Sequence, residues 1–172
     1  MIWINWSIVS SKGFEGFNCC VCFYIENNKN WIFVNDFNDS SFYGTTQKCL
    51  TNDSNVSQFS TPFEIAIKLK NSLDFGPNLY LKVLSFDSRN RLISESYGLV
   101  EIPIQRGRHS AIVNTWKPFI GNRMARMKQF FIGCVPIVHN FHTDSTQLNV
   151  RLNELFLNDI KTFNLILDKN SQ

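Results

Sequence analysis

Hydrophobic and polar residues alternate along most of the chain, as they do in strands with one buried and one solvated face. The clearest case is residues 63–70, in which apolar side chains occupy every second position: Phe63, Ile65, Ile67 and Leu69. The same pattern predicts strands at residues 2–9, 18–25, 31–34, 62–70, 79–86, 97–104, 109–114, 147–152 and 162–168. Residues 35–60, rich in Asn, Asp, Ser and Thr, are predicted to form a long loop around one short strand. Short strands separated by turns at this spacing predict an all-β fold, an antiparallel β-sandwich.

Residues 121–132 depart from this alternation, because their apolar side chains recur at three- and four-residue spacing. That spacing gives a helix one apolar face, made of Met124, Met127, Phe130 and Phe131. Basic side chains flank the face: Arg123, Arg126 and Lys128. Asn122 can cap the start of the helix, and Gly133 followed by Pro136 can end it. The segment therefore predicts a short amphipathic helix inserted between strands.

The composition favours strands over helices. The 172 residues include 16 Phe and 20 Asn but only 3 Ala, and Asn forms neither helices nor strands well. A hydrophobic fraction of 44% is enough to build a core, which excludes a mainly disordered chain. No linker or internal repeat divides the sequence, so we expect one domain over residues 1–168 with a short tail at 169–172.

The first nine residues are apolar but contain no basic residue, so they are interpreted as a strand rather than a signal peptide. No segment reaches the roughly 18–20 uninterrupted apolar residues of a membrane span. The five cysteines are odd in number, and three of them, Cys19, Cys20 and Cys22, fall in one predicted strand, which does not suit a disulfide framework. We therefore expect an intracellular protein with reduced thiols, in which Cys20 and Cys22 pack as small hydrophobes on one strand face.

The formal net charge of +3 hides an uneven distribution. Residues 82–128 hold nine basic and three acidic side chains, a local net charge of +6. An anionic partner could bind there, although cations on exposed strand positions and helix flanks would give the same count. The candidate contact residues, for a partner protein or for acidic lipid, are Arg106, Arg108, His109, Arg123, Arg126 and Lys128. No run of three basic residues and no RNA-recognition signature occurs, so no nucleic acid partner is expected.

The sequence contains none of the common patterns for catalysis. It has no phosphate-binding glycine loop, no Gly-x-Ser-x-Gly and no His-Glu-x-x-His, so we expect no enzyme activity, no cofactor and no bound metal. One alternative stays open, a metal-dependent enzyme with Cys134, His139 and His142 as ligands, although no fourth ligand is evident. Calcium needs several converging carboxylates and is not expected at the turn after Asp87, which continues with two arginines.

Several short motifs, taken in order, resemble the signature of the B9 domain family. Four motifs follow one another in the order seen in the family. They are an aspartate turn at Ser85–Arg91, a tyrosine–glycine pair in Ser96–Gly98, a strand that ends near a proline at Ile102–Pro103 and a glycine–histidine turn at Arg106–His109. Further pieces agree in order with the family: Gly13–Phe14, Trp31, Gly44–Gln47, Phe75–Pro77, Thr115–Pro118 and Phe131–Pro136. The resemblance covers about residues 1–168 and departs at Ser96, Arg106 and Cys134, where the family has glycine, proline and glycine.

The resemblance implies a sandwich similar to the C2 domain, without a full set of calcium ligands. It assigns fold-shaping roles to Gly13, Phe14, Asp87, Tyr97, Gly98, Pro103, Gly107, Trp116, Pro118, Gly133 and Pro136. It also implies a non-enzymatic subunit of the Meckel syndrome (tectonic-like) complex, whose partners are other B9-domain proteins and further subunits of that complex. The implied location is the cytoplasmic side of the ciliary base, at the transition zone and basal body and associated with the cytoskeleton. An autonomous module that binds acidic phospholipid through the basic residues, without calcium, is the alternative.

Overall fold

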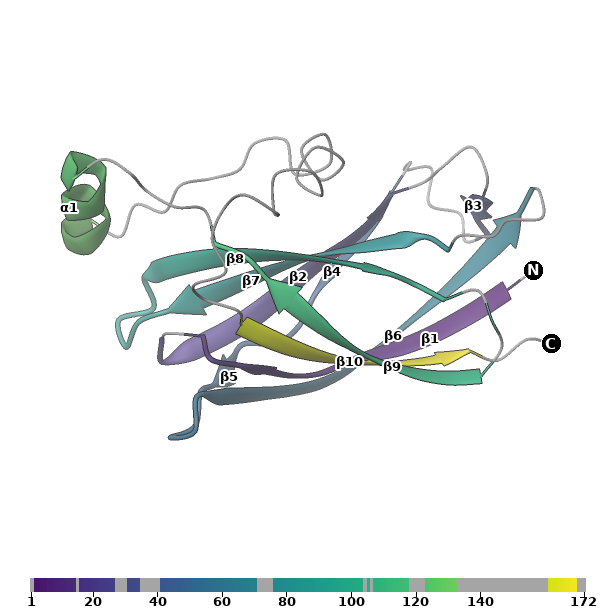
Figure 1. The fold of residues 1–172 in the computed structure, drawn as a ribbon, viewed down its shortest axis with the longest axis horizontal. Coiled ribbons are helices and arrows are strands. Elements are labelled where there is room, and N and C mark those ends of the chain that lie inside the picture. Colours follow the sequence, from purple (N-terminus) through teal and green to yellow (C-terminus); the bar gives the residue numbers. More distant parts are fainter. Residues whose placement is uncertain are drawn as a thin grey trace.

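The computed structural model has two antiparallel sheets that lie face to face (Figure 1). The structure describes residues 2–14, 16–26, 31–34, 41–70, 76–103, 105, 107–117, 123–132 and 161–169. The strands are β1 (Ile2–Lys12), β2 (Asn18–Glu26), β3 (Trp31–Phe33), β4 (Ser41–Thr45), β5 (Cys49–Leu50), β6 (Val56–Leu69), β7 (Asn78–Phe86), β8 (Leu92–Glu101), β9 (Gly107–Thr115) and β10 (Lys161–Lys169), and the helix is α1 (Arg123–Ile132). The predicted antiparallel β-sandwich is confirmed.

Sheet A has the strand order β3-β6-β1-β10-β9, and sheet B has the order β4-β2-β7-β8 with the short β5 paired to β2. The strand nearest the start of the chain, β1, therefore lies beside β10, with Asn5 opposite Asp168 and Lys12 opposite Thr162. Along its other edge β10 pairs with β9 over the whole length of both strands. As a result β10 joins β1 to β9 in sheet A.

The core lies between the two sheets and follows the predicted alternation. The inward residues include Ile4, Trp6 and Ile8 of β1, Val21, Phe23 and Ile25 of β2, and Leu79, Leu81 and Val83 of β7. At its centre the indole of Trp6 meets the ring of Phe23 edge-on, with centroids 5.8 Å apart. Burial of each large apolar side chain contributes about 1.5–3 kcal/mol, so this layer is the main source of stability.

β6 is longer than the sequence pattern predicted. It begins at Val56, inside the segment expected to be loop, and β4 and β5 lie in that segment too. The loop prediction was wrong because polar side chains in this segment form hydrogen bonds with one another inside the fold. The hydroxyl groups of Thr51 and Ser57, for example, are hydrogen-bonded at 2.9 Å. A bulge at Phe59 and Ser60, where Ser60 has a φ of 44°, keeps the long strand paired with β1.

β8 begins at Leu92, earlier than the predicted strand at 97–104. Its first half escaped prediction because it is polar yet buried, at Ser94, Glu95 and Ser96. The other predicted strands and the helix match within a few residues, except for the strand at 147–152, which lies outside the described residues. In the part of the chain that the structure describes, no helix is long and apolar enough to cross a membrane.

Candidate partner-binding surface

Helix α1 lies at one end of the sandwich with its apolar side chains exposed (Figure 1). Met124 and Met127 are 64% and 57% exposed, and Phe130 and Phe131 are 80% and 67% exposed. The two phenylalanine rings contact each other edge-on, with centroids 5.2 Å apart. A surface helix normally buries such a face against its own protein, and a continuous exposed apolar patch marks a place that contacts another molecule.

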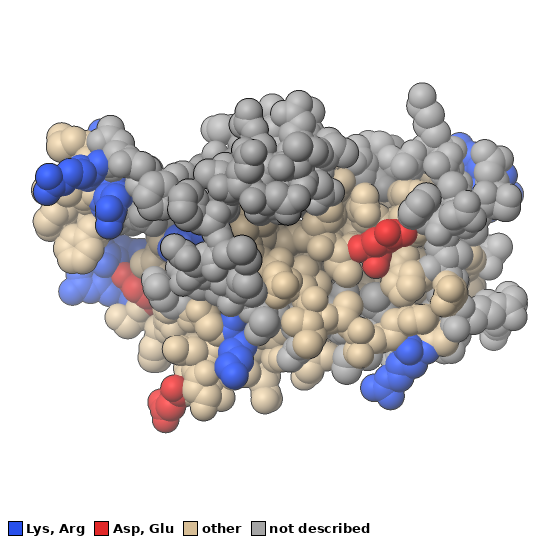
Figure 2. Space-filling model, viewed as in Figure 1, with Lys and Arg blue, Asp and Glu red and all other residues tan. Residues whose placement is uncertain are grey.

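The charged side chains of α1 are all positive. Arg123, Arg126 and Lys128 are exposed, and no acidic residue occurs between residues 123 and 132. Figure 2 shows Lys and Arg side chains gathered at this end of the molecule, with more isolated cations elsewhere on the same face. The helix therefore offers an apolar strip bordered by cations, which suits a contact that is both apolar and anionic.

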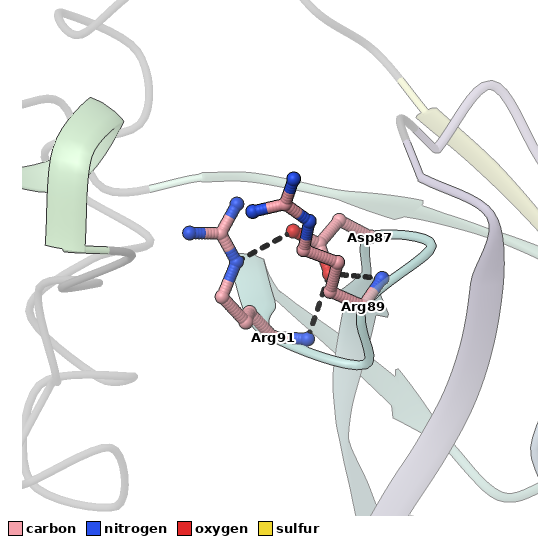
Figure 3. Close-up of polar contacts among 3 residues, drawn as sticks. All are labelled: Asp87, Arg89 and Arg91. Carbon is pink, nitrogen blue, oxygen red and sulfur yellow. Dashed lines mark hydrogen bonds and ion pairs between the residues drawn. The ribbon is translucent and has the colours of Figure 1, made fainter.

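The turn between β7 and β8 adds two arginines at the same end of the sandwich as α1 (Figures 1 and 3). Oδ1 of Asp87 accepts hydrogen bonds from the backbone N–H groups of Arg89 and Arg91 at 2.9 and 2.8 Å, and Oδ2 accepts one from Nε of Arg91 at 2.8 Å. These bonds, led by the backbone N–H of Arg91, hold the pKa of the Asp87 carboxyl below its usual value. The aspartate thus fixes the turn from which both guanidinium groups reach solvent.

This arrangement does not suit calcium, because both carboxylate oxygens of Asp87 are engaged by N–H donors and a guanidinium lies beside them. Among the described residues, no three His, Cys, Asp or Glu side chains converge in a way that could hold a metal ion. The alternative metal ligands Cys134, His139 and His142 lie outside those residues.

The structure divides the basic segment between two ends of the molecule. Arg108 is exposed and His109 is half-buried at the start of β9, near the N and C labels in Figure 1, whereas α1 lies at the opposite end. The separation arises because β9 runs along sheet A between the two groups. Arg106 lies outside the described residues. The cations of α1 therefore share their end of the sandwich with the β7–β8 turn and not with Arg108 and His109.

Two contributions to this surface did not follow from the charge count. The apolar face of α1 was predicted, but only its flanking cations were selected as contact residues. Arg89 and Arg91 belong to the basic stretch at residues 82–128 but are not among the six candidate contact residues. In the sequence, this surface is indicated by an arginine-rich turn and by a helix that contains no carboxylate. The two lie at the same end of the molecule because β7 and β8 form a hairpin.

The family profile described as "Ciliary basal body-associated, B9 protein" matches residues 2–155 of the chain. The chain belongs to the B9 family. Three curated relatives are each described as "Tectonic-like complex member MKS1". The Rattus norvegicus protein is 33% identical over 144 residues, the Mus musculus protein 35% over 142 and the Homo sapiens protein 33% over 141.

Each of these alignments covers 77% of the B9 chain and 25% of the relative, so the chain spans about a quarter of the length of the curated relatives it matches. Among solved structures, a C2 domain of plant Extended Synaptotagmin 1 aligns with a TM-score of 0.47 and 6% identity, covering 99% of this chain and 95% of that chain.

Tyr97 and Trp116, to which the resemblance assigns fold-shaping roles, connect β8 to the residue that follows β9. They exchange two backbone hydrogen bonds of 2.8 Å, and their rings pack with centroids 5.1 Å apart. The hydroxyl of Tyr97 donates to Oε2 of the buried Glu95 at 2.7 Å, and Nζ of Lys82 lies 3.0 Å from the same oxygen. Tyr97 is 1% exposed, which fits a role in shaping the fold and not in contacting a partner.

The remaining signature residues that the structure describes lie in turns or at close contacts. The N–H of Gly13, which has a φ of 84°, donates to the carbonyl of Asn55 at 2.9 Å. A Cβ at Gly98 would lie 3.1 Å from Cγ2 of Thr115, which leaves little room for a side chain. Phe14 is buried, Pro103 is half-buried and Gly107 has a φ of 133°. Outside the described residues lie Pro118, Gly133 and Pro136.

Proposed function

We propose that this B9 protein is a non-enzymatic structural subunit of the tectonic-like (Meckel syndrome) complex at the ciliary transition zone. The observation that carries the proposal is the B9 family match over residues 2–155. The similarity to proteins described as tectonic-like complex member MKS1 supports it. In this role the protein serves cilium assembly and the diffusion barrier at the ciliary base. The proposed location is the cytoplasmic side of that base, at the transition zone and basal body, in association with the cytoskeleton.

The proposed partners are other B9-domain proteins and further subunits of the same complex. The motif Thr115–Pro118 supports a finer assignment, to B9 domain-containing protein 2. Helix α1 supports the physical mechanism, because burial of its exposed Phe130 and Phe131 against a partner would release apolar surface from water. Its three cations would favour an acidic rim on that partner.

Expression of the tagged chain in ciliated cells tests this proposal. We expect fluorescence at the ciliary base and recovery of B9-domain relatives on pull-down. The double variant Phe130→Ser with Phe131→Ser should reduce that recovery, because it removes the apolar strip. Ile112→Ser is the matched control, since Ile112 is 68% exposed but belongs to β9 and not to α1. Even distribution through the cytosol with no B9 relatives recovered would overturn the proposal.

The same helix supports a second candidate function, calcium-independent binding to acidic phospholipid. A short helix with Phe and Met on one face and Arg and Lys beside them can lie in the interface of an anionic membrane. Each cation close to such a surface contributes about 1 kcal/mol of attraction. α1 carries three, and the β7–β8 turn adds the exposed Arg89 and the Arg91–Asp87 ion pair, a net charge of +1, at the same end.

Sedimentation with vesicles of phosphatidylcholine, with and without phosphatidylserine, tests the second function. Binding that needs phosphatidylserine, ignores calcium chelation and weakens with salt is expected. The triple variant Arg123→Glu, Arg126→Glu and Lys128→Glu should abolish it, whereas Arg108→Glu, at the other end of the molecule, should not. Binding that survives the triple variant, or that is unaffected by salt, would exclude this function for α1.

A further inference from the structure

Strand β4 is an edge of sheet B, because it pairs with β2 on one side and with no described strand on the other. Just beyond β4, the N–H of Thr46 donates to the carbonyl of Val21 on β2 at 2.8 Å. Backbone groups along an antiparallel strand point alternately to its two sides, so those of Thr45 and Tyr43 point away from β2. On that side neither residue has a backbone hydrogen-bond partner among the described residues. β4 therefore presents a row of unpaired donors and acceptors, which is the chemistry that an added strand recognises.

β4 also lacks the features that keep another strand edge of this protein from pairing. The outer edge of β6, which β3 covers only at residues 67–69 in the part of the chain that the structure describes, carries Pro62 and a bulge. Proline and bulges protect an exposed edge, because they remove a donor or disturb the regular spacing of the ladder. In contrast, Ser41–Thr45 contains no proline and no charged residue, and its pairing with β2 has no bulge. The edge of β4 is thus regular and unprotected.

An aromatic row on the outer face of sheet B ends at this edge. Tyr43 of β4 is opposite Tyr24 of β2, and Tyr24 is opposite Tyr80 of β7. The rings of Tyr24 and Tyr80 lie with their centroids 5.9 Å apart. Tyr43, at the open end of the row, is 72% exposed. A residue on an added strand would therefore pack directly against the ring of Tyr43, as aromatic residues do in cross-strand pairs.

β4 is complementary to itself when two copies lie antiparallel with Tyr43 at the centre. In that register Tyr43 faces Tyr43 of the second copy, Ser41 faces Thr45, and Phe42 faces Gly44, which has no side chain. The residues whose backbone groups point to the free edge then face one another along the whole of β4. No like charges meet, because the strand carries none, and the two tyrosines form an aromatic cross-strand pair.

We propose that this B9 protein forms a two-fold symmetric dimer in which β4 of one copy pairs antiparallel with β4 of a second copy. Sheet B of one copy then continues into sheet B of the other, and each copy contributes the same strand, as two-fold symmetry requires. The contact uses no residue of α1, so it is separate from the surface described under the proposed function. Because β4 has 5 residues, the strand pair buries less surface than a dimer interface of standard size, and we expect a dimer that dissociates on dilution.

Sedimentation equilibrium of the full chain over a range of concentrations tests the proposal. The average mass should rise toward twice that of one chain as the concentration increases. Tyr43→Lys and Tyr43→Glu should each leave the chain monomeric, because like charges then face each other at the centre of the strand pair. Ile112→Lys is the matched control, since Ile112 is 68% exposed on β9, and it should leave the association unchanged.

An equimolar mixture of Tyr43→Lys and Tyr43→Glu should associate again, because opposite charges then face each other. This rescue separates a contact between copies from a loss of folding, which mixing would not repair. A chain that stays monomeric at every concentration would overturn the proposal, as would association that Tyr43→Lys leaves unchanged. A mixture that stays monomeric would contradict the placement of Tyr43 at the two-fold axis.

Hydrogen exchange of single backbone amides, followed by nuclear magnetic resonance, gives a measurement on the unaltered chain. The amides of Tyr43 and Thr45 should exchange more slowly as the concentration and the fraction of dimer rise, because they become hydrogen-bonded between the copies. The amide of Gly44, which points toward β2 in a single copy, is the internal control and should change little. Equal slowing at all three amides, or slowing at none, would contradict pairing through the edge of β4.

Discussion

Tyr97 and Trp116 are bound to each other by two backbone hydrogen bonds of 2.8 Å and by rings whose centroids lie 5.1 Å apart. Tyr97 belongs to β8, an edge strand of sheet B, and Trp116 follows β9, an edge strand of sheet A. The pair therefore connects the two sheets at one edge of the sandwich. Two segments that are separate in the sequence and that resemble B9 motifs meet in this one contact.

Substitution of Trp116 should destabilise the protein strongly. Trp116→Ala removes the ring packed on Tyr97 and should lower the free energy of unfolding by about 2–4 kcal/mol. Trp116→Phe keeps an aromatic ring and should lose less than half of that amount. Urea unfolding followed by circular dichroism measures both, with the exposed Asn114→Ala on β9 as control. If Trp116→Ala unfolds at the same urea concentration as the control, the contact between Tyr97 and Trp116 does not stabilise the fold.

Gly44 should not tolerate a side chain. A Cβ at this position would overlap the ring of Phe23, which lies in the core beneath it. Gly44→Ala should therefore lower the free energy of unfolding by about 1–3 kcal/mol, the usual cost of overpacking. Phe23→Leu removes the ring that the new Cβ would overlap. Introduced together with Gly44→Ala, it should therefore restore part of the lost unfolding free energy, which thermal unfolding measures. Additive losses in the double variant would contradict this explanation.

The Asp87 turn predicts a contribution to stability that disappears in acid. The pKa of this carboxyl is lower in the folded protein than in the unfolded chain, so the contribution is present above about pH 4 and is lost as the pH falls through the native value. Asp87→Asn removes the charge. The difference in urea midpoint between the unaltered protein and Asp87→Asn should be larger near pH 6 than near about pH 2.5. A difference that does not change with pH would argue against the role of the carboxylate.

Strand β10 should be essential although it lies beyond the residues matched by the B9 family profile, 2–155. A chain shortened to residue 155 lacks the strand that pairs with both β1 and β9, so it should lose cooperative unfolding. A chain shortened to residue 169 keeps β10 and is the control. Calorimetry or near-ultraviolet circular dichroism separates the two, and a normal transition in the shorter chain would show that β10 is dispensable.

The sequence predicted the sandwich well where burial follows hydrophobicity. Residues 63–70 alternate cleanly, and the strand lies there with Ile65 and Ile67 in the core. Prediction failed where polar residues of a strand are buried. Ser57 is 1% exposed and Ser94 is 1% exposed, yet both are strand residues, and no pattern of hydrophobic positions reveals a hydroxyl that is buried.

The candidate surface was predicted in part. Helix α1 and its three cations followed from residue spacing alone. The sequence could not show that the apolar face of α1 stays exposed, because the same spacing occurs in helices packed on their own domain. Nor could it show that Arg108 and Arg123, close in the sequence, lie at opposite ends, since that separation depends on the path of β9 through sheet A.

The position of β10 also has a consequence for the order in which the protein assembles during its synthesis. All strands of sheet B lie between residues 18 and 101, so that sheet can pair soon after its hairpins leave the ribosome. β1 leaves earlier but must wait for residues 161–169 before its second edge is covered. An uncovered strand edge pairs readily with other chains. The interval between the synthesis of β1 and that of β10 is therefore the period in which a nascent B9 protein is most exposed to misassembly and most in need of a chaperone.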